Sequence, residues 1–255
     1  MYAEERRQAM AELITQRGRL SVNELAEAYT VTTETVRRDL SALEQSGLVR
    51  RVHGGAVPAD ALTVLETAVT DRDLARAEEK ERIAQAALDQ LPRAGGSVLL
   101  DAGTTTSRLA AHLPRDLRLT VMTNAVPIAA RLAGAPGVDL HLLPGRVRRT
   151  TQAAVGEDTV SALSVLRPDV VFLGTNGFSL GHGLSTPDHS EAAAKRAMVS
   201  AGRRIVVLAD SSKIGAEHTV RFAELGDVDV LVTDAGIAEA DRKAFEDYGI
   251  EVVVA

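Results

Sequence analysis

Several short polar stretches after residue 100 contain residue types that bind small anions. The longest, Asp101-Ala102-Gly103-Thr104-Thr105-Thr106, follows an apolar stretch and precedes a helical pattern. Glycine lets a ligand approach the backbone, and the N–H groups and hydroxyls at the start of a helix favour phosphate. Similar residues recur at Thr123 and Asn124, Gly145 and Arg146, Gly174 and Asn176, and Asp210, Ser212 and Lys213. Together, these hydroxyls, amides, carboxylates and a lysine are typical of a site for a sugar phosphate.

These polar stretches share one position, because each follows a predicted strand. From Glu78 onward apolar runs alternate with helical patterns, which predicts a largely parallel α/β sheet with helices on both faces. Ligands bind beyond the carboxyl ends of such strands, so we expect one crevice there. The predicted strands are Ser97–Leu100, Leu119–Met122, Val138–Leu143, Val170–Leu173, Arg204–Ala209, Val228–Val232 and Glu251–Val254. The predicted helices are Glu78–Leu91, Thr105–Leu113, Ala125–Ala133, Thr159–Leu166, Ser190–Ala201 and Ile237–Tyr248.

Each polar stretch also has a purely structural interpretation, since glycine, asparagine and aspartate cap helices and form turns. Glu191 and Lys195 lie one helical turn apart and could contact the ligand or form a surface ion pair. Lys213 could be an ordinary solvated lysine. His182 and His189 flank a predicted loop and supply too few ligands for a metal ion, so no metal site is expected. No cofactor is expected either.

The first part of the chain predicts a winged helix-turn-helix. Ser21 and Glu24 have the spacing of a capping box, and Thr32 is a good N-cap for the helix that follows it. The expected elements are a helix over Ala3–Arg17, a second helix from Asn23, a third helix over Thr33–Ser46, and a wing over Leu48–Gly55.

The third of these helices is the candidate DNA-reading element. Val36, Leu40 and Leu43 lie on one face at i, i+4 and i+7 and are expected to be buried, so the rest of the helix is available to the major groove. An arginine there can bind guanine or pair with phosphate, and both interpretations remain open. A solvated basic face on an ordinary three-helix domain is the alternative. The candidate DNA-binding residues are Thr32, Thr33, Glu34, Thr35, Arg37, Arg38, Ser41, Arg50, Arg51 and His53.

Composition limits the class of protein. The 255 residues carry a formal net charge of −6 and no cysteine, which excludes disulfides, thiol catalysis and cysteine metal sites. No apolar run approaches the roughly 18 residues of a membrane span, and the amino terminus lacks the pattern of a signal peptide. We therefore expect a cytoplasmic protein with a DNA-binding domain over residues 1–57, a linker over 58–77 and an α/β sensor domain over 78–255.

Three stretches carry a resemblance to a known family. They are Arg6 with Met10 and Ile14, the run Thr32–Leu40 (TTETVRRDL), and the run Arg50–Gly55 (RRVHGG). In these stretches, and along nearly the whole chain, the sequence resembles the DeoR family of bacterial transcriptional regulators. Thr32 stands where serine is common in the family, which keeps the capping hydroxyl.

The resemblance implies a Rossmann-like sensor domain similar to ribose-5-phosphate isomerase, binding a phosphorylated sugar that relieves repression. The implied effector-binding stretches are Asp101–Thr105, Thr123-Asn124, Glu191 with Lys195, and Asp210–Lys213. On this basis we assign the phosphate to Gly103–Thr105 and Lys213, and the sugar hydroxyls to Asp101, Asn124, Asn176 and Asp210.

The leading hypothesis is a DNA-binding regulator, not an enzyme, that represses a sugar catabolic operon and is released by a phosphorylated sugar. The alternative is a sugar-phosphate isomerase with an accessory DNA-binding domain, since Asp101, Glu191 and Lys213 include residue types for proton transfer beside a carbonyl. Activation instead of repression also remains open. Palindromic half-sites need paired reading heads, so a homodimer or homotetramer is expected on double-stranded operator DNA, with no membrane partner.

Overall fold

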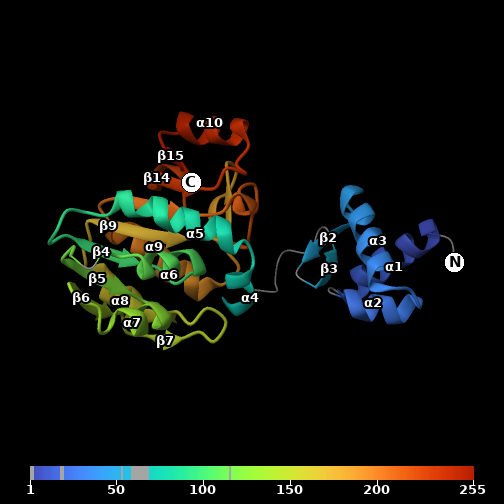
Figure 1. Cartoon of the computed structure of the whole chain (residues 1–255), viewed down its shortest axis with the longest axis horizontal. Helices are drawn as coiled ribbons and strands as arrows, with labels where there is room; N and C mark the ends of the chain where they lie inside the picture. The colour runs from blue at the N-terminus through green and yellow to red at the C-terminus, as the bar shows by residue number, and fades with distance from the viewer. Residues whose placement is uncertain (1–2, 18–19, 53, 59–68, 115) are drawn as a thin grey trace. The chain divides into compact units, whose positions relative to one another are not determined.

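The computed structural model describes residues 3–17, 20–52, 54–58, 69–114 and 116–255 (Figure 1). Contacts within the chain divide it into two compact parts, the N-terminal unit Met1–Val64 and the C-terminal unit Leu65–Ala255. Each unit has a hydrophobic core of its own. Over the described residues, no helix combines the length and the apolar character that crossing a membrane requires.

The N-terminal unit confirms the predicted helix-turn-helix with its wing. Its elements are α1 (Ala3–Arg17), β1 (Leu20–Ser21), α2 (Val22–Tyr29), α3 (Thr33–Gln45), β2 (Val49–Val52) and β3 (Gly55–Pro58). The predicted capping box is present, because Glu24 N–H donates to Ser21 Oγ at 3.1 Å and Ser21 N–H donates to the Glu24 carboxylate at 2.8 Å. Thr32 Oγ1 accepts a hydrogen bond from Thr35 N–H at 3.2 Å, which satisfies a free donor at the start of α3.

Apolar side chains and one buried carboxylate hold α1 against α3. Val36 and Leu40 are fully buried and Leu43 nearly so, as the helical spacing predicts. Asp39, on the same helix, is also buried, and its carboxylate accepts hydrogen bonds from Arg6 Nε at 2.7 Å and Arg7 Nε at 3.0 Å. The arginine of α1 that carries the family resemblance therefore has a structural partner in α3.

The C-terminal unit is built on a seven-stranded sheet with strand order β15-β14-β12-β9-β4-β5-β6. Every neighbouring pair in it is parallel, as the alternation of strands and helices predicts. Its strands are β4 (Ser97–Leu100), β5 (Leu119–Thr123), β6 (Val138–Leu142), β9 (Val170–Gly174), β12 (Ile205–Leu208), β14 (Val230–Thr233) and β15 (Glu251–Val254).

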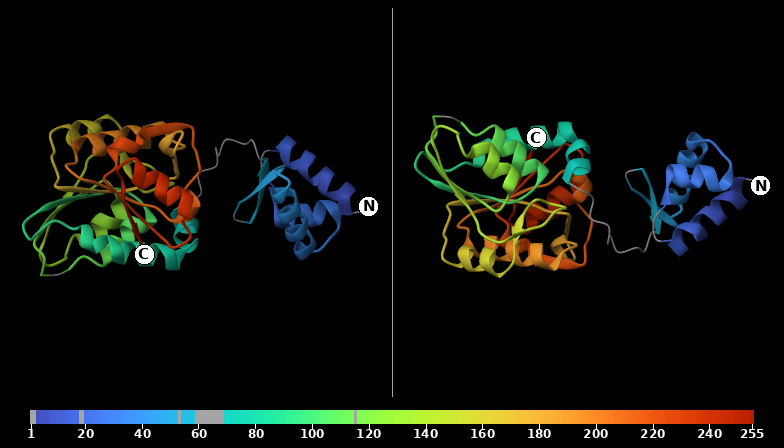
Figure 2. Two further views of the ribbon diagram at one scale, coloured as in Figure 1. Left: turned by 90° about the horizontal axis from the view of Figure 1, so that it is seen from above. Right: turned by 90° about the horizontal axis from the view of Figure 1, so that it is seen from below.

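Helices cover both faces of this sheet (Figure 2). One face packs against α5 (Ala77–Ala86), α6 (Thr104–Ala111) and α7 (Val126–Leu132), through Ile83, Leu109 and Ile128. The other face packs against α8 (Glu157–Ser164), α9 (His189–Ala201) and α10 (Glu239–Asp247). Burial on both faces explains why the strands read as continuous apolar runs.

Some elements are absent from the sequence prediction. A small antiparallel sheet has strand order β10-β11-β13, and β7 pairs with β8 as a separate hairpin. Helix α4 lies inside the expected linker 58–77. The bounds of these elements are α4 (Val69–Leu74), β7 (Arg146–Val147), β8 (Ala154–Val155), β10 (Gly177–Ser179), β11 (Gly183–Thr186) and β13 (Val220–Ala223), with short 3₁₀ turns at Ala87–Gln90, Ser211–Lys213 and Leu225–Asp227.

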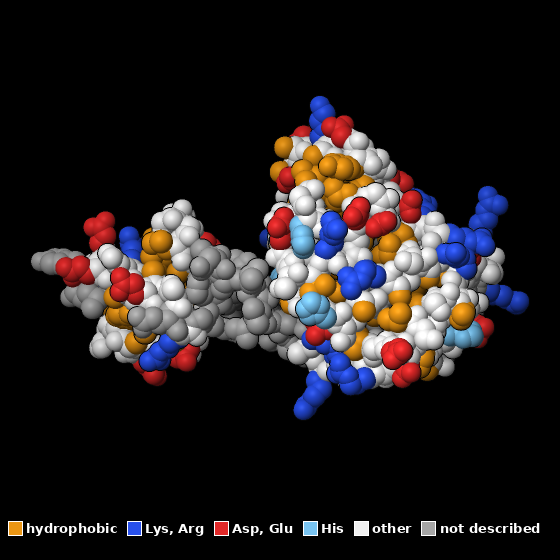
Figure 3. Space-filling model, turned by 180° about the vertical axis from the view of Figure 1, so that it is seen from behind, with side chains coloured by type: hydrophobic (Ala, Val, Ile, Leu, Met, Phe, Trp, Pro, Cys, Tyr) orange, Lys and Arg blue, Asp and Glu red, His pale blue; other side chains and the backbone are white. Residues whose placement is uncertain are grey.

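Charged side chains of both signs are interspersed on the face of the C-terminal unit seen in Figure 3. With a chain net charge of −6, this surface does not provide the uniform positive field that non-specific nucleic-acid binding requires. The DNA contacts that the sequence predicts must therefore come from a local surface.

The buried carboxylate of α3 gives a stability prediction. Asp39→Asn leaves Arg6 and Arg7 without their anion, and breaking such a buried pair costs roughly 3–5 kcal/mol. Because Arg7 is 37% exposed, we expect a smaller loss of about 2–3 kcal/mol in urea unfolding of the full chain. Glu34→Gln is the matched control, since the exposed Glu34–Arg37 pair on the same helix contributes less than about 1 kcal/mol. Equal stability of the two variants would contradict this role of Asp39.

Candidate functional site

The exposed side of α3 carries the candidate DNA-reading residues. Glu34, Arg37 and Arg38 are exposed, while Thr33, Thr35 and Ser41 are partly exposed. Arg37 lies 3.4 Å from the Glu34 carboxylate, and Ser41 Oγ donates to the Arg37 carbonyl at 2.9 Å. Arg38 makes no hydrogen bond or ion pair within the part of the chain that the structure describes. Its guanidinium is therefore available to a base or a phosphate.

The structure describes the wing residues only in part. Arg50 and Arg51 belong to β2, but their side chains, like all of His53, lie outside the described residues. Their predicted contact with the DNA backbone stays a prediction.

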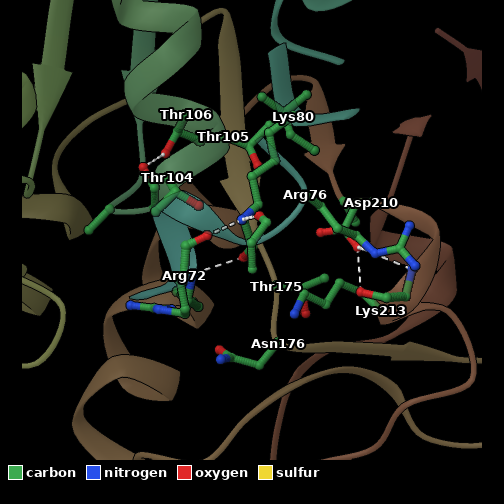
Figure 4. A pocket seen from close by; sticks show the side chains of 18 of the residues that line it. Arg72, Arg76, Lys80, Thr104, Thr105, Thr106, Thr175, Asn176, Asp210 and Lys213 are labelled. Atoms are coloured by element: carbon green, nitrogen blue, oxygen red, sulfur yellow. Dashed lines mark hydrogen bonds and ion pairs between the residues drawn. The ribbon is translucent and has the colours of Figure 1, made fainter. Parts of the chain in front are cut away.

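A cavity of about 170 Å³ lies at the carboxyl edge of the parallel sheet, where the strand ends of β4, β9 and β12 meet (Figure 4). It is smaller than the roughly 300–1,000 Å³ clefts that hold drug-sized ligands, which suits a small metabolite. Its lining residues are Arg72, Ala75, Arg76, Lys80, Ala102, Gly103, Thr104, Thr105, Thr106, Gly174, Thr175, Asn176, Glu191, Lys195, Leu208, Ala209, Asp210, Ser212 and Lys213.

A buried ion pair lies beside this cavity. Lys195 Nζ donates to the Asp101 carboxylate and, at 2.8 Å, to the carbonyl of Gly174. The same carboxylate accepts the Gly174 N–H at 3.1 Å, so it connects the end of β4 to the end of β9. Burial raises the pKa of Asp101, and the Lys195 ammonium opposes that rise.

The interpretation of Glu191 and Lys195 as a surface ion pair is wrong. Both side chains are buried, and each has a different partner. Glu191 accepts a hydrogen bond from Arg148 at 2.6 Å, while Lys195 pairs with Asp101. Both residues line the cavity, as the ligand-site interpretation requires.

The start of α6 offers free donors to the cavity. Gly103 is the N-cap and supplies no side chain, and the first backbone bond of the helix runs from Ser107 N–H to the Gly103 carbonyl at 3.0 Å. Within the described residues the N–H groups of Thr104, Thr105 and Thr106 have no backbone or side-chain acceptor. This arrangement suits an anion, as the sequence predicts.

Three basic residues of the cavity escaped the sequence analysis: Arg72 of α4, Arg76 between α4 and α5, and Lys80 of α5. Lys80 is buried, and its Nζ donates to the carbonyls of Arg72 and, at 2.6 Å, of Ala75. Burial lowers the pKa of Lys80 to about 8, with Asp210 opposing the shift. Arg76 Nε lies 3.7 Å from the Asp210 carboxylate. The spacing of these basic residues, four apart at 72, 76 and 80, was the sequence signal from which they could have been predicted.

Five predicted effector residues do not line the cavity: Asp101, Thr123, Asn124, Gly145 and Arg146. Thr123 Oγ1 donates to the Leu100 carbonyl at 2.7 Å, and Asn124 Oδ1 accepts the Ala102 N–H at 3.1 Å. Both side chains therefore support the end of β4 and the polar loop after it without lining the cavity. Gly145, with φ +137°, packs against Val155, and Arg146 is exposed in β7. Asp101 contacts a lining residue, and the remaining predicted effector residues are lining residues themselves.

Comparison with known proteins covers both units. The model of a DeoR-like helix-turn-helix domain matches residues 6–61, and that of the DeoR C terminal sensor domain matches residues 75–235. The HTH-type transcriptional regulator GlpR of Haloferax volcanii is 35% identical, over 99% of this chain and 98% of its own length. The glycerol-3-phosphate regulon repressor of Escherichia coli K12 is 31% identical, over 97% of each chain.

Among solved structures, ribose 5-phosphate isomerase A from Methanocaldococcus jannaschii aligns with 55% of this chain and 55% of its own. The identity is 15% and the TM-score 0.41.

The ion pair beside the cavity gives a second stability prediction. Lys195→Met leaves the Asp101 carboxylate buried without a cation, so we expect a loss of roughly 3–5 kcal/mol at neutral pH. Protonation of Asp101 relieves that penalty, so the gap to the wild type narrows as the pH falls. The control is Asp101→Asn combined with Lys195→Met, which removes both charges and loses less. Urea unfolding of the three proteins between pH 5 and 8 measures this, and a gap independent of pH would contradict it.

Proposed function

Because the chain belongs to the DeoR family of DNA-binding transcriptional regulators, we propose that it represses a sugar catabolic operon and leaves its operator when a phosphorylated sugar binds. One observation carries the proposal. The chain that contains the helix-turn-helix also contains a small cavity, lined by cations, hydroxyls and free backbone donors, at the carboxyl edge of a parallel sheet.

The charges of the lining favour a dianionic group on the ligand. Lys80 and Lys213 have no carboxylate within ion-pair distance among the described residues, and the α6 N–H groups adjoin the same cavity. We assign the phosphate to Thr104–Thr106, Lys213 and Lys80.

The carboxylate and amide side chains of the cavity suit the rest of a sugar phosphate. The Asp210 carboxylate accepts hydrogen bonds, the Asn176 amide accepts and donates them, and the Thr175 hydroxyl oxygen accepts them, so we assign these groups to the sugar hydroxyls. A volume of about 170 Å³ limits the ligand to a small phosphorylated sugar or polyol. Glycerol 3-phosphate, after which the regulon of the E. coli relative is named, belongs to that chemical class.

Repression also needs paired reading heads. Residues 1–58 contain eight arginines and eight acidic residues, so one N-terminal unit has no net positive charge to hold DNA by itself. We propose a homodimer or homotetramer in the cytoplasm that binds two half-sites, and a ligand-bound form whose arrangement fits the operator poorly.

The two alternatives are weaker. An isomerase function is set aside, because the relatives that match along the whole chain are transcriptional regulators. Repression is favoured over activation, since the E. coli relative is named a repressor.

The free arginine of α3 tests the DNA-reading surface. Arg38→Ala should weaken binding to an operator, selected by the purified protein from random DNA, by roughly 1–3 kcal/mol if Arg38 contacts a base. Gln45→Ala, an exposed change at the other end of α3, is the control and should have little effect. Titrations with operator and with unrelated DNA distinguish a base contact from a phosphate contact. If the variant binds both DNAs equally more weakly, Arg38 contacts phosphate. No weakening on either removes Arg38 from the interface.

The cavity is tested by release of that operator in a gel shift. Fructose 1-phosphate, glucose 6-phosphate, ribose 5-phosphate and glycerol 3-phosphate form the panel, and we expect at least one to release the wild-type protein. Lys213→Ala should leave operator affinity unchanged and raise the required ligand concentration about 10- to 100-fold, the value of one charge-assisted hydrogen bond. Lys243→Ala, exposed on α10, should behave as wild type. Loss of DNA binding by the Lys213 variant would count against a sensing role.

A further inference from the structure

The segment Arg72–Lys80, here the α4–α5 joint, lines the cavity and is also the start of the described C-terminal unit. It contributes Arg72, Ala75, Arg76 and Lys80 to the lining (Figure 4). In the sequence, only residues 59–68 separate α4 from β3 of the N-terminal unit. A ligand in the cavity would therefore contact the segment of the C-terminal unit that is nearest in sequence to the N-terminal unit.

The ammonium of Lys80 connects the two helices of this joint. Its Nζ donates to the carbonyls of Arg72 and Ala75, at and beyond the end of α4, while its own Cα belongs to α5. Among the described residues no backbone N–H donates to these carbonyls, so Lys80 supplies the hydrogen bonds that join them to α5. Arg76, between them, has φ +53°, a left-handed conformation that costs a non-glycine residue energy and persists only where its surroundings hold it.

The present partners of Lys80 are poor ones for a buried cation. Two neutral carbonyls replace the water that burial removes, and no carboxylate lies within ion-pair distance among the described residues. Asp210 and Asp73 favour its charge from further away, whereas Lys213 and Arg108 oppose it. A phosphate dianion in the same cavity is a stronger partner than either carbonyl.

We propose that the ligand's phosphate withdraws the Lys80 ammonium from the carbonyls of Arg72 and Ala75, and that the resulting release of α4 from α5 lowers operator affinity. This inference rests on the proposed function and names the residue that connects the ligand to the joint. Lys213 and the start of α6 bind the same phosphate, but among the described residues neither donates to the carbonyls of Arg72 and Ala75. Arg108, further along α6, donates instead to the carbonyl of Asp73 at 3.0 Å and to its carboxylate at 2.7 Å.

Hydrogen exchange of the full-length protein tests the joint directly. The probe is the sugar phosphate of the panel above that binds most tightly by calorimetry. At saturation we expect the amides of residues 72–80 to exchange at least tenfold faster, while those of α9 exchange at an unchanged or slower rate. Unchanged or slower exchange over residues 72–80 would overturn the inference, because the joint would then stay closed around the ligand.

Two variants each remove one positive charge from the cavity, one at Lys80 and the other at Lys213. Lys80→Met should give fast exchange over residues 72–80 without ligand, lower operator affinity, and little further response to saturating ligand. Lys213→Met should weaken ligand binding by a similar 10- to 100-fold, yet keep the full exchange response and full release at saturation. An identical response of the two variants would assign Lys80 to ligand binding alone.

Proton uptake on ligand binding can be measured in the wild type, so it tests the inference even if the Lys80→Met variant does not fold. A lysine with a pKa of about 8 is half protonated at pH 8, and a bound dianion raises that pKa. Calorimetry at pH 8 in buffers of different ionisation enthalpy should therefore show uptake of about half a proton per ligand. Affinity should then decline as the pH rises from 8 to 9.5. Binding without uptake would mean that the phosphate does not reach Lys80, and the inference would fail.

The outcomes distinguish this inference from the function on which it rests. If the wild type binds none of the panel, or binds one and stays on its operator, the proposed function fails. If binding and release occur without the exchange change and the proton uptake, only the role of Lys80 fails.

Discussion

The buried ion pair between Asp101 and Lys195 is the constraint on which the cavity depends. A charge inside a protein is tolerated only when it is paired and hydrogen-bonded, because desolvation costs several kcal/mol per ion. Here one carboxylate satisfies both Lys195 and the Gly174 N–H, so the ends of β4 and β9 and the helix α9 are fixed relative to one another. The polar loop after β4 is therefore held in place, and among the described residues the first N–H groups of α6, beside the cavity, have no acceptor.

The same principle governs the DNA-reading helix. Asp39 lies within the run TTETVRRDL, yet its carboxylate is buried against Arg6 and Arg7 of α1. Two arginines of α1 are thus partly neutralised in the fold. Arg38, one residue earlier on α3, points its charge to the exposed side. Part of the family pattern is therefore structural, and it positions the exposed part, to which we assign the contacts with DNA.

Much of this architecture could be predicted from local sequence, and the failures have a common cause. Continuous apolar runs located the parallel strands, and Ser21, Glu24 and Thr32 located the helix starts, since both signals depend on near neighbours. The partner of Lys195 is 94 residues away in the sequence, so one-turn spacing to Glu191 gave a false alternative. Helix α4 has few residues and is stabilised by Lys80, and β10, β11 and β13 are short strands buried by tertiary packing. Thr123 and Asn124 have ligand-binding chemistry but are used to support the loop.

The free energies involved show why a change of partner at Lys80 is sufficient for the regulation that we propose. Allosteric coupling between two sites is typically 1–3 kcal/mol, or about 5- to 150-fold in affinity. A single hydrogen bond to a charged group contributes about 1.5–3 kcal/mol, so the loss of one such bond from the joint falls within this range. Lys80 suits this role because burial has already weakened its charged form, which makes its choice between carbonyls and an anion sensitive to what the cavity holds. Lys195 cannot act in this way, since its Asp101 partner is a full charge that a ligand would have to displace. The cavity therefore combines a fixed cation that maintains its geometry with a second cation whose partner can change.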